Sequence, residues 1–334
     1  MTALKTISLL VPFYNEGGGV ETFARSISAI LEQIPCYAFE IVCIDDGSKD
    51  STLAELLAVQ RRDPRFTIIE LSRNFGKEAA MTAGIDSASG EAIIPIDADL
   101  QDPPELIGQM IELWEQGAEV VLARRIDRSS DSYLKRKTAT LFYRFHNALS
   151  GIKIPENVGD YRLMDRVVAE AIKQLPERQR FMKGLFTWVG FKTVTLDYKR
   201  QARQVGATKF SGWKLWNFAL EGITSFSTAP LKVMTYLGAM GTLITSLYAI
   251  YIVIKTLVHG VDLPGYASLL VAILFIGSLQ LIGIGILGEY IGRIYMESKQ
   301  RPIYVVRNRH QRITKEQNDA AGIPLHQLQQ LRHG

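Results

Sequence analysis

Two long uncharged segments near the carboxyl end constrain the fold of this chain more than any other feature. Val233–Ile254 and Tyr266–Gly288 run for 22 and 23 residues without Asp, Glu, Lys or Arg. At about 1.5 Å per residue, each helix would be roughly 33 Å long, which is enough to cross the hydrocarbon core of a bilayer. Buried helices of soluble domains are the alternative, but they rarely run this long without a charge. We therefore expect two transmembrane helices, at about 233–257 and 266–290, within residues 231–296.

The charges that flank the two segments predict their orientation. The loop between them, at about 255–265, holds only Lys255, His259 and Asp262, whereas basic residues gather on the other two sides. Because positive side chains stay on the cytoplasmic side, we expect both ends in the cytoplasm and the short loop outside. The basic residues are Lys199, Arg200, Arg203, Lys209, Lys214 and Lys232 before the first segment, and Arg293, Lys299, Arg301, Arg307 and Arg309 after the second.

The stretch before the first segment has the pattern of an amphipathic helix. Ser211–Phe226 carries Trp213 and Trp216 on one apolar face, together with aliphatic residues. Since tryptophan favours the membrane interface, we interpret residues 211–230 as a juxtamembrane interfacial helix. The alternative is a helix packed on the soluble domain.

Two further features concern the carboxyl-terminal part. Glycines recur along the second segment, which permits close helix contact, although membrane helices also simply tolerate glycine. The first interpretation fits a homo-oligomer, for example a tetramer. The tail at 297–334 is basic and lacks apolar periodicity, so we expect a loosely ordered, lipid-facing cytoplasmic segment.

The first part of the chain alternates short apolar runs with stretches of helical length. The runs are nearly continuous and rich in Ile and Val, which is typical of strands buried on both faces of a parallel sheet. Strand followed by helix, repeated, predicts a doubly wound α/β domain, whose ligands bind at the carboxyl ends of the strands. The expected strands are 7–14, 39–45, 66–72, 92–97 and 119–123, and the expected helices are 20–33, 51–61, 77–87 and 103–116.

Composition sets further limits on this domain. A net charge of +4 and a pI near 8.9 are too mild to indicate a nucleic-acid partner and suit a membrane surface. Cys36 and Cys43 match neither a metal site nor a disulfide framework, so we expect two buried thiols in a reducing compartment. Since the first residues lack a signal-peptide pattern, we expect residues 1–210 to lie in the cytoplasm.

The sharpest chemical feature is the acidic loop after the fourth apolar run. Asp97 and Asp99 flank Ala98, and Gln101 can add a carbonyl oxygen. Oxygen ligands of this kind suit Mg²⁺ or Mn²⁺, which bridge protein carboxylates and substrate phosphates. The alternative is a cluster of acids near the dipole of the next helix, a role that we assign to Asp102. For the first two acids we favour the metal, because uncompensated carboxylates at a strand end need a cation.

Two more motifs follow the first two strands. VPFYNE at 11–16 and IDDGSKDST at 44–52 place polar residues at strand ends, where an acid can accept hydrogen bonds from a base or ribose. Taken alone, this signal is weak, since D-G-S also forms ordinary turns and helix caps. Neither a dinucleotide fingerprint nor a phosphate-binding P-loop is present in the sequence.

In this order and spacing, VPFYNE, IDDGSKDST and DADLQDPPE resemble the family-two inverting glycosyltransferases with a GT-A fold. The resemblance covers Lys5 to about Phe210. Further motifs and the two spans narrow it to the bacterial polyprenyl-phosphate glycosyltransferases, which include bactoprenol glucosyl transferases and are related to dolichol-phosphate mannosyl transferase. These motifs are LSRNFGKEAAMTAG (71–84), ENVGDYRLMDR (156–166), RQVGATKF (203–210) and GEYIGRIYMESKQRP (288–302).

The resemblance implies roles for individual residues. Thr208 stands where most members have Ser, and the hydroxyl is retained. By group, the implied residues are Pro12, Tyr14, Glu16, Ile44, Asp45 and Asp46 for base and ribose; Lys77, Asp97, Ala98, Arg124, Arg203 and Lys209 for the remainder of the nucleotide-sugar; Asp97, Asp99 and Gln101 for the metal; and Arg136, Arg203 and Lys209 for the acceptor phosphate.

Asp160 is the candidate catalytic carboxylate, together with Asp97. A phosphomonoester has a second pKa of about 6, so the acceptor is largely dianionic at neutral pH and hardly needs a base. Asp160 could therefore orient the acceptor or the sugar. Its alternative interpretation is a turn residue beside Gly159.

The resemblance implies transfer of a hexose, most simply glucose from UDP-glucose, to undecaprenyl phosphate at the inner membrane of a bacterium, for O-antigen or other envelope glycans. Formamido-arabinose or mannose donors are alternatives. Three rivals are a processive polysaccharide synthase, which usually has more spans; a non-catalytic membrane scaffold; and a metal-dependent phosphotransferase, which should have a glycine-rich phosphate loop.

Overall fold

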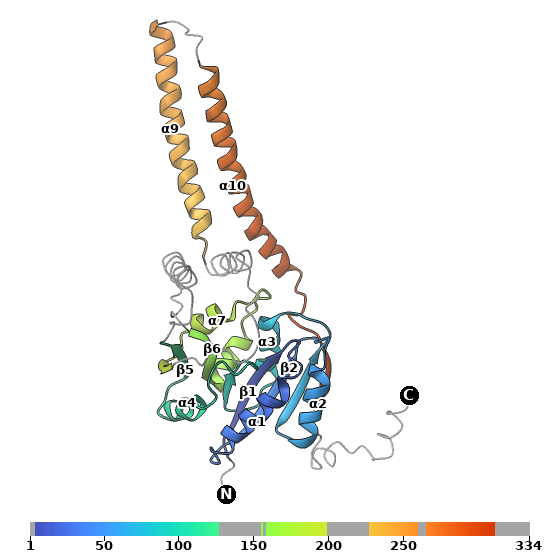
Figure 1. Cartoon of the computed structure of the whole chain (residues 1–334). Helices are drawn as coiled ribbons and strands as arrows, with labels where there is room; N and C mark the ends of the chain where they lie inside the picture. Colours follow the sequence, from blue (N-terminus) through green and yellow to red (C-terminus); the bar gives the residue numbers. More distant parts are fainter. Residues whose placement is uncertain (1–3, 127–154, 156–157, 199–226, 260–264, 311–334) are drawn as a thin grey trace.

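The computed structural model describes residues 4–126, 155, 158–198, 227–259 and 265–310. These residues form an α/β domain and a long helical hairpin that extends away from it (Figure 1). The fold class expected from the sequence is confirmed: a mostly parallel sheet with helices on both faces, followed by two apolar helices. Most of the expected interfacial helix at 211–230, namely residues 211–226, and the tail at 311–334 lie outside the described residues.

Four parallel strands form the centre of the sheet. They are β1 (Thr6–Phe13), β2 (Ala38–Asp45), β3 (Phe66–Leu71) and β4 (Ala92–Pro95), in the spatial order β4-β1-β2-β3. Their side chains are almost entirely buried, which agrees with the continuous apolar runs in the sequence.

The two thiols differ from the prediction. Cys43 on β2 is buried, whereas Cys36 is exposed. The prediction was wrong for Cys36 because this residue lies in the turn before β2 rather than on the strand, so neither face of the sheet covers it.

Successive strand residues face two separate apolar cores. Phe13, Phe23 and Phe66 lie in one core, and Leu10, Ile44 and Ile69 lie in the other. The first is covered by α1 (Val20–Leu31), α2 (Thr52–Arg62) and α4 (Leu106–Glu115), and the second by α3 (Lys77–Ser87), α6 (Arg166–Lys173) and α7 (Met182–Trp188).

Three further strands extend the sheet beyond β4. β6 (Val158–Asp165) lies between β4 and β5 (Val120–Arg125) and is antiparallel to both, and β7 (Thr193–Tyr198) pairs in parallel with β5. The sequence predicted β5 but neither β6 nor β7. The antiparallel direction of β6 brings its first residues to the same sheet edge as the carboxyl ends of the parallel strands.

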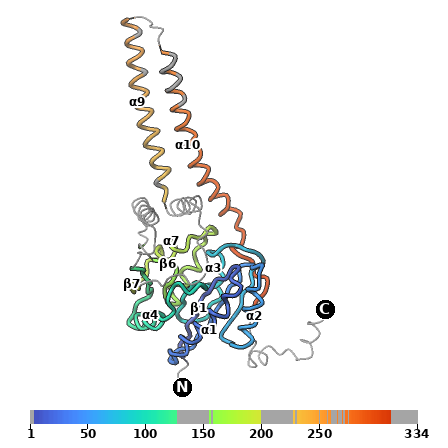
Figure 2. The backbone as a smooth tube through the Cα atoms, in the orientation of Figure 1, coloured from blue at the N-terminus to red at the C-terminus, as the bar shows by residue number. Residues whose placement is uncertain are grey.

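The opposite edge of the sheet contains a strand from the carboxyl-terminal tail. β8 (Val306–His310) pairs antiparallel with β3, with Asn308 opposite Glu70 and Arg309 opposite Ile69. Figure 2 shows this segment returning from the hairpin to the edge of the domain. The prediction of a loosely ordered, lipid-facing tail was therefore wrong for these residues, because they pair with β3 at the edge of the sheet.

The hairpin consists of α9 (Ala229–His259) and α10 (Tyr266–Ser298). Both helices extend beyond the uncharged segments. Pro230–His259 and Phe275–Ser298 are long and apolar enough to cross a membrane, and their apolar side chains are not covered by other parts of the protein that the structure describes. This arrangement supports association with a membrane.

Candidate active site

Polar residues gather where β1, β2 and β4 end, at one edge of the sheet. Tyr14 follows β1, Asp45 ends β2, and Asp97 comes shortly after β4. Since these strands are parallel, their carboxyl ends meet, and a ligand can contact all three loops at once. The sequence predicted this clustering correctly.

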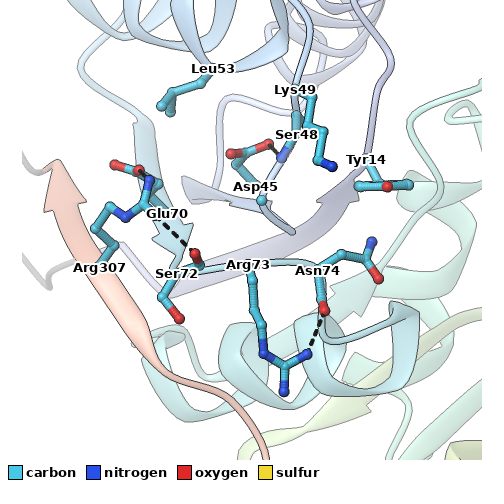
Figure 3. A pocket seen from close by; sticks show the side chains of 11 residues that line it. Tyr14, Asp45, Ser48, Lys49, Leu53, Glu70, Ser72, Arg73, Asn74 and Arg307 are labelled. Carbon is cyan, nitrogen blue, oxygen red and sulfur yellow. Dashed lines mark hydrogen bonds and ion pairs between the residues drawn. The ribbon is translucent and has the colours of Figure 1, made fainter.

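A cavity of about 500 Å³ lies beside the ends of β2 and β3 (Figure 3). Tyr14 and Asp45, two of the predicted nucleoside-binding residues, line it. Tyr14 is 44% exposed and offers an aromatic ring to the cavity. The other lining residues are Gly47, Ser48, Lys49, Leu53, Glu70, Ser72, Arg73, Asn74 and Arg307.

Asp46 holds a neighbouring loop rather than lining this cavity. Its carboxylate accepts hydrogen bonds from the backbone N–H groups of Phe75, at 2.7 Å, and Gly76, at 2.9 Å. Burial raises the pKa of Asp46, and the two backbone hydrogen bonds offset part of that effect. Asp46 thus fixes the loop between β3 and α3, including Arg73 and Asn74, against the end of β2.

Lys77, the first residue of α3, joins two of the predicted catalytic acids. Its Nζ lies 2.7 Å from Oδ1 of Asp97 and 2.8 Å from Oδ2 of Asp160. Burial alone raises the pKa of Asp160, but Lys77, Lys183 and Arg162 outweigh burial and lower it to about 2. Asp160 is therefore ionised at neutral pH, as an acid with an orienting role requires.

This geometry changes one premise of the sequence argument. Asp97 was treated as an uncompensated acid that needs a metal cation, whereas the structure gives it Lys77 as a partner. Lys77 stays protonated in this position. Desolvation lowers its pKa, but Asp160 and Asp97 together raise the pKa of Lys77 above its ordinary value.

Asp99 and Gln101 form the part of the acidic loop that suits a divalent cation. Gln101 donates from Nε2 to Oδ2 of Asp99 at 2.8 Å, so the two side chains lie together and their oxygens are hard ligands. Among the described residues, no group of three or more His, Cys, Asp or Glu could hold a metal by itself. The residues fit an ion that takes its other ligands from phosphate and water, as Mg²⁺ commonly does.

A half-buried acid that the sequence analysis did not select, Glu78, lies next to this cluster. Oε2 of Glu78 accepts a hydrogen bond from the backbone N–H of Met182 at 3.0 Å. Burial and the nearby Asp160 charge raise the pKa of Glu78 to about 7. The sequence analysis selected its neighbour Lys77 but not Glu78, because adjacent side chains at the start of a helix point in different directions.

The remaining predicted residues are less central. Ile44 is fully buried in the core, so only its backbone can face a ligand. Arg124 forms a paired contact with Asp197 of β7, at 2.7 and 2.9 Å. The backbone N–H of Glu16 donates to Thr52 at 2.9 Å, which ties the loop after β1 to α2. Pro12 lies on β1 opposite Ile44, and Ala98 lies between Asp97 and Asp99 in the sequence. Arg136, Arg203 and Lys209 lie outside the described residues.

Asp102 is buried and accepts a hydrogen bond from the Tyr198 hydroxyl at 2.6 Å, so it links the loop before α4 to β7. The contact gives Asp102 a structural role, which the sequence analysis had placed at the dipole of the next helix.

A doubly wound sheet with a cavity and acidic side chains along the carboxyl edge of its strands is the arrangement of a nucleotide-binding α/β enzyme. Residues 8–173 match the family Glycosyl transferase family 2, and residues 229–294 match the GtrB C-terminal hairpin. The chain belongs to glycosyl transferase family 2 and carries this hairpin, so the resemblance seen in the motifs is confirmed.

Several relatives are similar along nearly their whole length. The bactoprenol glucosyl transferase of Shigella phage SfV is 55% identical over 92% of this chain and 99% of its own. A prophage bactoprenol glucosyl transferase homolog of Escherichia coli (strain K12) is 52% identical over 90% of this chain and 98% of its own. An uncharacterized glycosyltransferase of Synechocystis is 51% identical over 90% of this chain and 94% of its own.

Proposed function

We propose that this glycosyltransferase transfers a hexose, most simply glucose from UDP-glucose, to undecaprenyl phosphate. The observation that carries the proposal is the similarity to the bactoprenol glucosyl transferase of Shigella phage SfV, which spans the catalytic domain and the hairpin alike. Bactoprenol is undecaprenol, so the acceptor of this chain would be its phosphate. The product would serve O-antigen or another envelope glycan.

The donor would lie along the carboxyl edge of the sheet. Tyr14 and Asp45 would contact the nucleoside in the cavity, while the diphosphate would extend towards Asp99 and Gln101. These two residues would hold Mg²⁺ or Mn²⁺. When bound, the ion neutralises charge that develops on the leaving nucleoside diphosphate.

The acceptor phosphate is its own nucleophile. With a second pKa of about 6, it is largely dianionic at neutral pH, so no protein group has to remove a proton. One of its oxygens forms a bond to the anomeric carbon as the bond from that carbon to the diphosphate oxygen breaks. Attack opposite to the leaving group inverts the anomeric centre and releases the nucleoside diphosphate.

Asp160 and Lys77 would orient the sugar at this step. An ionised Asp160 would accept hydrogen bonds from sugar hydroxyls. Lys77 contacts both Asp160 and Asp97 and so fixes the position of the Asp160 carboxylate. A fixed arrangement of this kind contributes to catalysis because it removes the cost of aligning the reactants during the reaction. Arg136, Arg203 and Lys209 would supply positive charge for the phosphates.

We further propose where the enzyme works. Two membrane helices flanked by basic residues favour the cytoplasmic face of the inner membrane of a bacterium, with both termini in the cytoplasm. The hairpin would keep the active site close to a carrier whose phosphate lies at the membrane surface. A homo-oligomer, for example a tetramer, remains part of this proposal on the glycine pattern of the second helix.

The test is transfer of radiolabelled sugar from a panel of nucleotide-sugars to undecaprenyl phosphate by the full chain in membranes. UDP-glucose should label the lipid, and EDTA and Asp99→Ala should each abolish labelling without loss of folded protein. Labelling by another donor would change the sugar alone. Growth of a polymer would favour a processive synthase, and the absence of labelling with every donor would favour a scaffold.

A further inference from the structure

The segment that follows the second membrane helix reaches the donor cavity. After α10 ends at Ser298, the chain runs back to the domain, where the Tyr304 hydroxyl donates to Oδ2 of Asp86 at 2.7 Å. The backbone N–H of Ser72 donates to the Val305 carbonyl at 2.9 Å, and β8 then pairs with β3. We call residues 299–310 the carboxyl-terminal arm. The arm places Arg307 in the wall of the cavity.

Glu70 fixes the arm at this point. Its side chain is only 8% exposed, and it accepts hydrogen bonds from Nη1 of Arg307 at 3.1 Å and Nδ2 of Asn308 at 3.0 Å. Burial alone raises the pKa of Glu70, but the hydrogen bonds from Asn308 and Arg307 outweigh burial and hold its pKa below the ordinary value. Glu70 therefore stays ionised and keeps Arg307 in a defined position.

The guanidinium of Arg307 is both held and available. Nη2 donates to the Ser72 carbonyl at 2.9 Å, so two contacts fix the plane of the group. The side chain is still 59% exposed and borders the cavity, and a guanidinium has five N–H donors. Figure 3 shows Arg307 and Tyr14 on opposite sides of the cavity. The N–H groups of Arg307 that remain after these two contacts can donate to an acceptor placed in the cavity between Arg307 and Tyr14.

The order of the strands indicates which part of the donor would lie beside Arg307. The metal-binding pair Asp99 and Gln101 follows β4, and the order continues β4-β1-β2-β3-β8. Three strand intervals separate β4 from β3, or about 14 Å at the usual strand spacing. That span is comparable with an extended nucleoside diphosphate. If the phosphates lie near Asp99, the nucleobase lies beside β3 and β8.

We propose that Arg307 recognises the nucleobase of the donor and favours uracil through the carbonyl oxygen at C4. The proposal rests on the proposed function, since it concerns the donor of the same reaction. A guanidinium offers only donors. At C4, uracil presents a carbonyl oxygen where cytosine presents an amino group, so a guanidinium facing this position attracts the first and is opposed by the second. The carboxyl-terminal arm, which follows the membrane hairpin, would thus form part of the donor site.

The experiment compares Arg307→Ala and Arg307→Lys with Arg309→Ala in the purified full chain. Arg309 lies two residues away on the same strand, is exposed, and does not line the cavity, so its variant removes the same charge. The readouts are KM for UDP-glucose and the dissociation constants of UDP and CDP. Arg307→Ala should raise KM and the UDP constant about tenfold or more, while the CDP constant changes little. Arg307→Lys should restore part of the loss.

The ratio of CDP to UDP dissociation constants decides the question, because a partly unfolded sample changes both constants alike. A ratio that is unchanged in Arg307→Ala, or equally reduced in Arg309→Ala, would overturn the role of Arg307. Failure of the wild type to transfer sugar from any donor would instead overturn the proposed function. The two failures are distinguishable because UDP binding is measured independently of transfer.

Discussion

At the residue scale, Lys77 is the side chain on which the arrangement of the site depends most. It lies between Asp97 and Asp160, two carboxylates that would otherwise repel each other. We expect Lys77→Met to lower kcat by about 100-fold or more, because Asp160 would lose its orientation and the largest of the charges that lower its pKa. Initial rates of lipid labelling at saturating donor measure this effect.

Lys5→Met is the matched control for Lys77. Lys5 also pairs with an acid, Glu115, at 2.8 Å, but this exposed pair lies at the start of β1, away from the carboxyl edge. Such pairs contribute little to stability, so the control should retain nearly full activity. Equal rates for the two variants would show that the Lys77 contacts have no part in catalysis.

A second prediction at this scale concerns Glu78 and pH. Its pKa in the folded protein is about 7, above the ordinary value of 4.5, so the folded state binds more protons than the unfolded state between these values. Stability should therefore fall as pH rises from about 4.5 to 7, by on the order of 3 kcal/mol at most. Thermal unfolding of Glu78→Gln and wild type across this range measures the difference, which should grow with pH. A constant difference would contradict the raised pKa.

The sequence predicted that acids would gather at one edge of the sheet, but it did not predict their partners. Asp45, Asp97 and Asp99 follow buried strands, and the strand-end rule alone brings them together. That Lys77 pairs with Asp97 and Asp160 depends on where α3 and β6 pack, and no local pattern shows this. The same holds for Arg307, whose position depends on strand pairing across more than two hundred residues.

At the element scale, the loops that line the cavity beside β2 and β3 pack backbone against backbone. Gly47 follows β2 with φ of +66°, and a Cβ there would lie 2.4 Å from the Arg73 carbonyl carbon and 2.7 Å from the Asn74 nitrogen. Gly47→Ala must displace the loop before α3. We expect it to raise the dissociation constant of UDP about tenfold or more, beyond any effect on stability.

Gly117→Ala provides the matched control for this loop. Gly117 also has a positive φ, of +90°, but a Cβ there would meet only the end of the Lys192 side chain at 3.9 Å. Both variants should lose about 1–2 kcal/mol of stability from the unfavourable φ. Only Gly47→Ala should weaken UDP binding in calorimetric titrations of folded protein, and equal binding by the two would contradict the predicted displacement.

The elements that the sequence predicted are those whose signal is local. The parallel strands appear as continuous apolar runs because helices cover both of their faces. β7 alternates between exposed and partly buried positions, and β8 reads VRNRH, so neither has such a run. β8 is an edge strand whose stability comes from pairing with β3 and from the contacts of Arg307 and Asn308 with Glu70. Charged residues are typical of edge strands, and this composition led us to expect a loose tail.

At the scale of the whole molecule, the end of the membrane hairpin is attached to the catalytic domain by Glu297. This residue of α10 accepts hydrogen bonds from the backbone N–H groups of Arg178, at 2.9 and 3.0 Å, and of Gln179, at 3.0 Å. The loop with these two residues leads directly to α7, whose first residue, Met182, donates to Glu78 beside Asp160. A short path of contacts therefore connects α10 with Glu78 and Asp160.

We expect Glu297→Ala to loosen this connection. The backbone N–H groups of Arg178 and Gln179 would lose their acceptor, at a cost of about 1–3 kcal/mol. Amide hydrogen exchange in residues 176–190 should become faster, and kcat should fall while UDP affinity stays the same, because the donor cavity lies at the other end of the sheet edge. Ser298→Ala, which changes an exposed residue of the same helix whose hydroxyl donates within that helix to the Tyr295 carbonyl, is the control. If exchange in this loop is equally slow in both variants, the hairpin and the active site are not coupled through Glu297, and the anchor acts only by keeping the enzyme near its lipid.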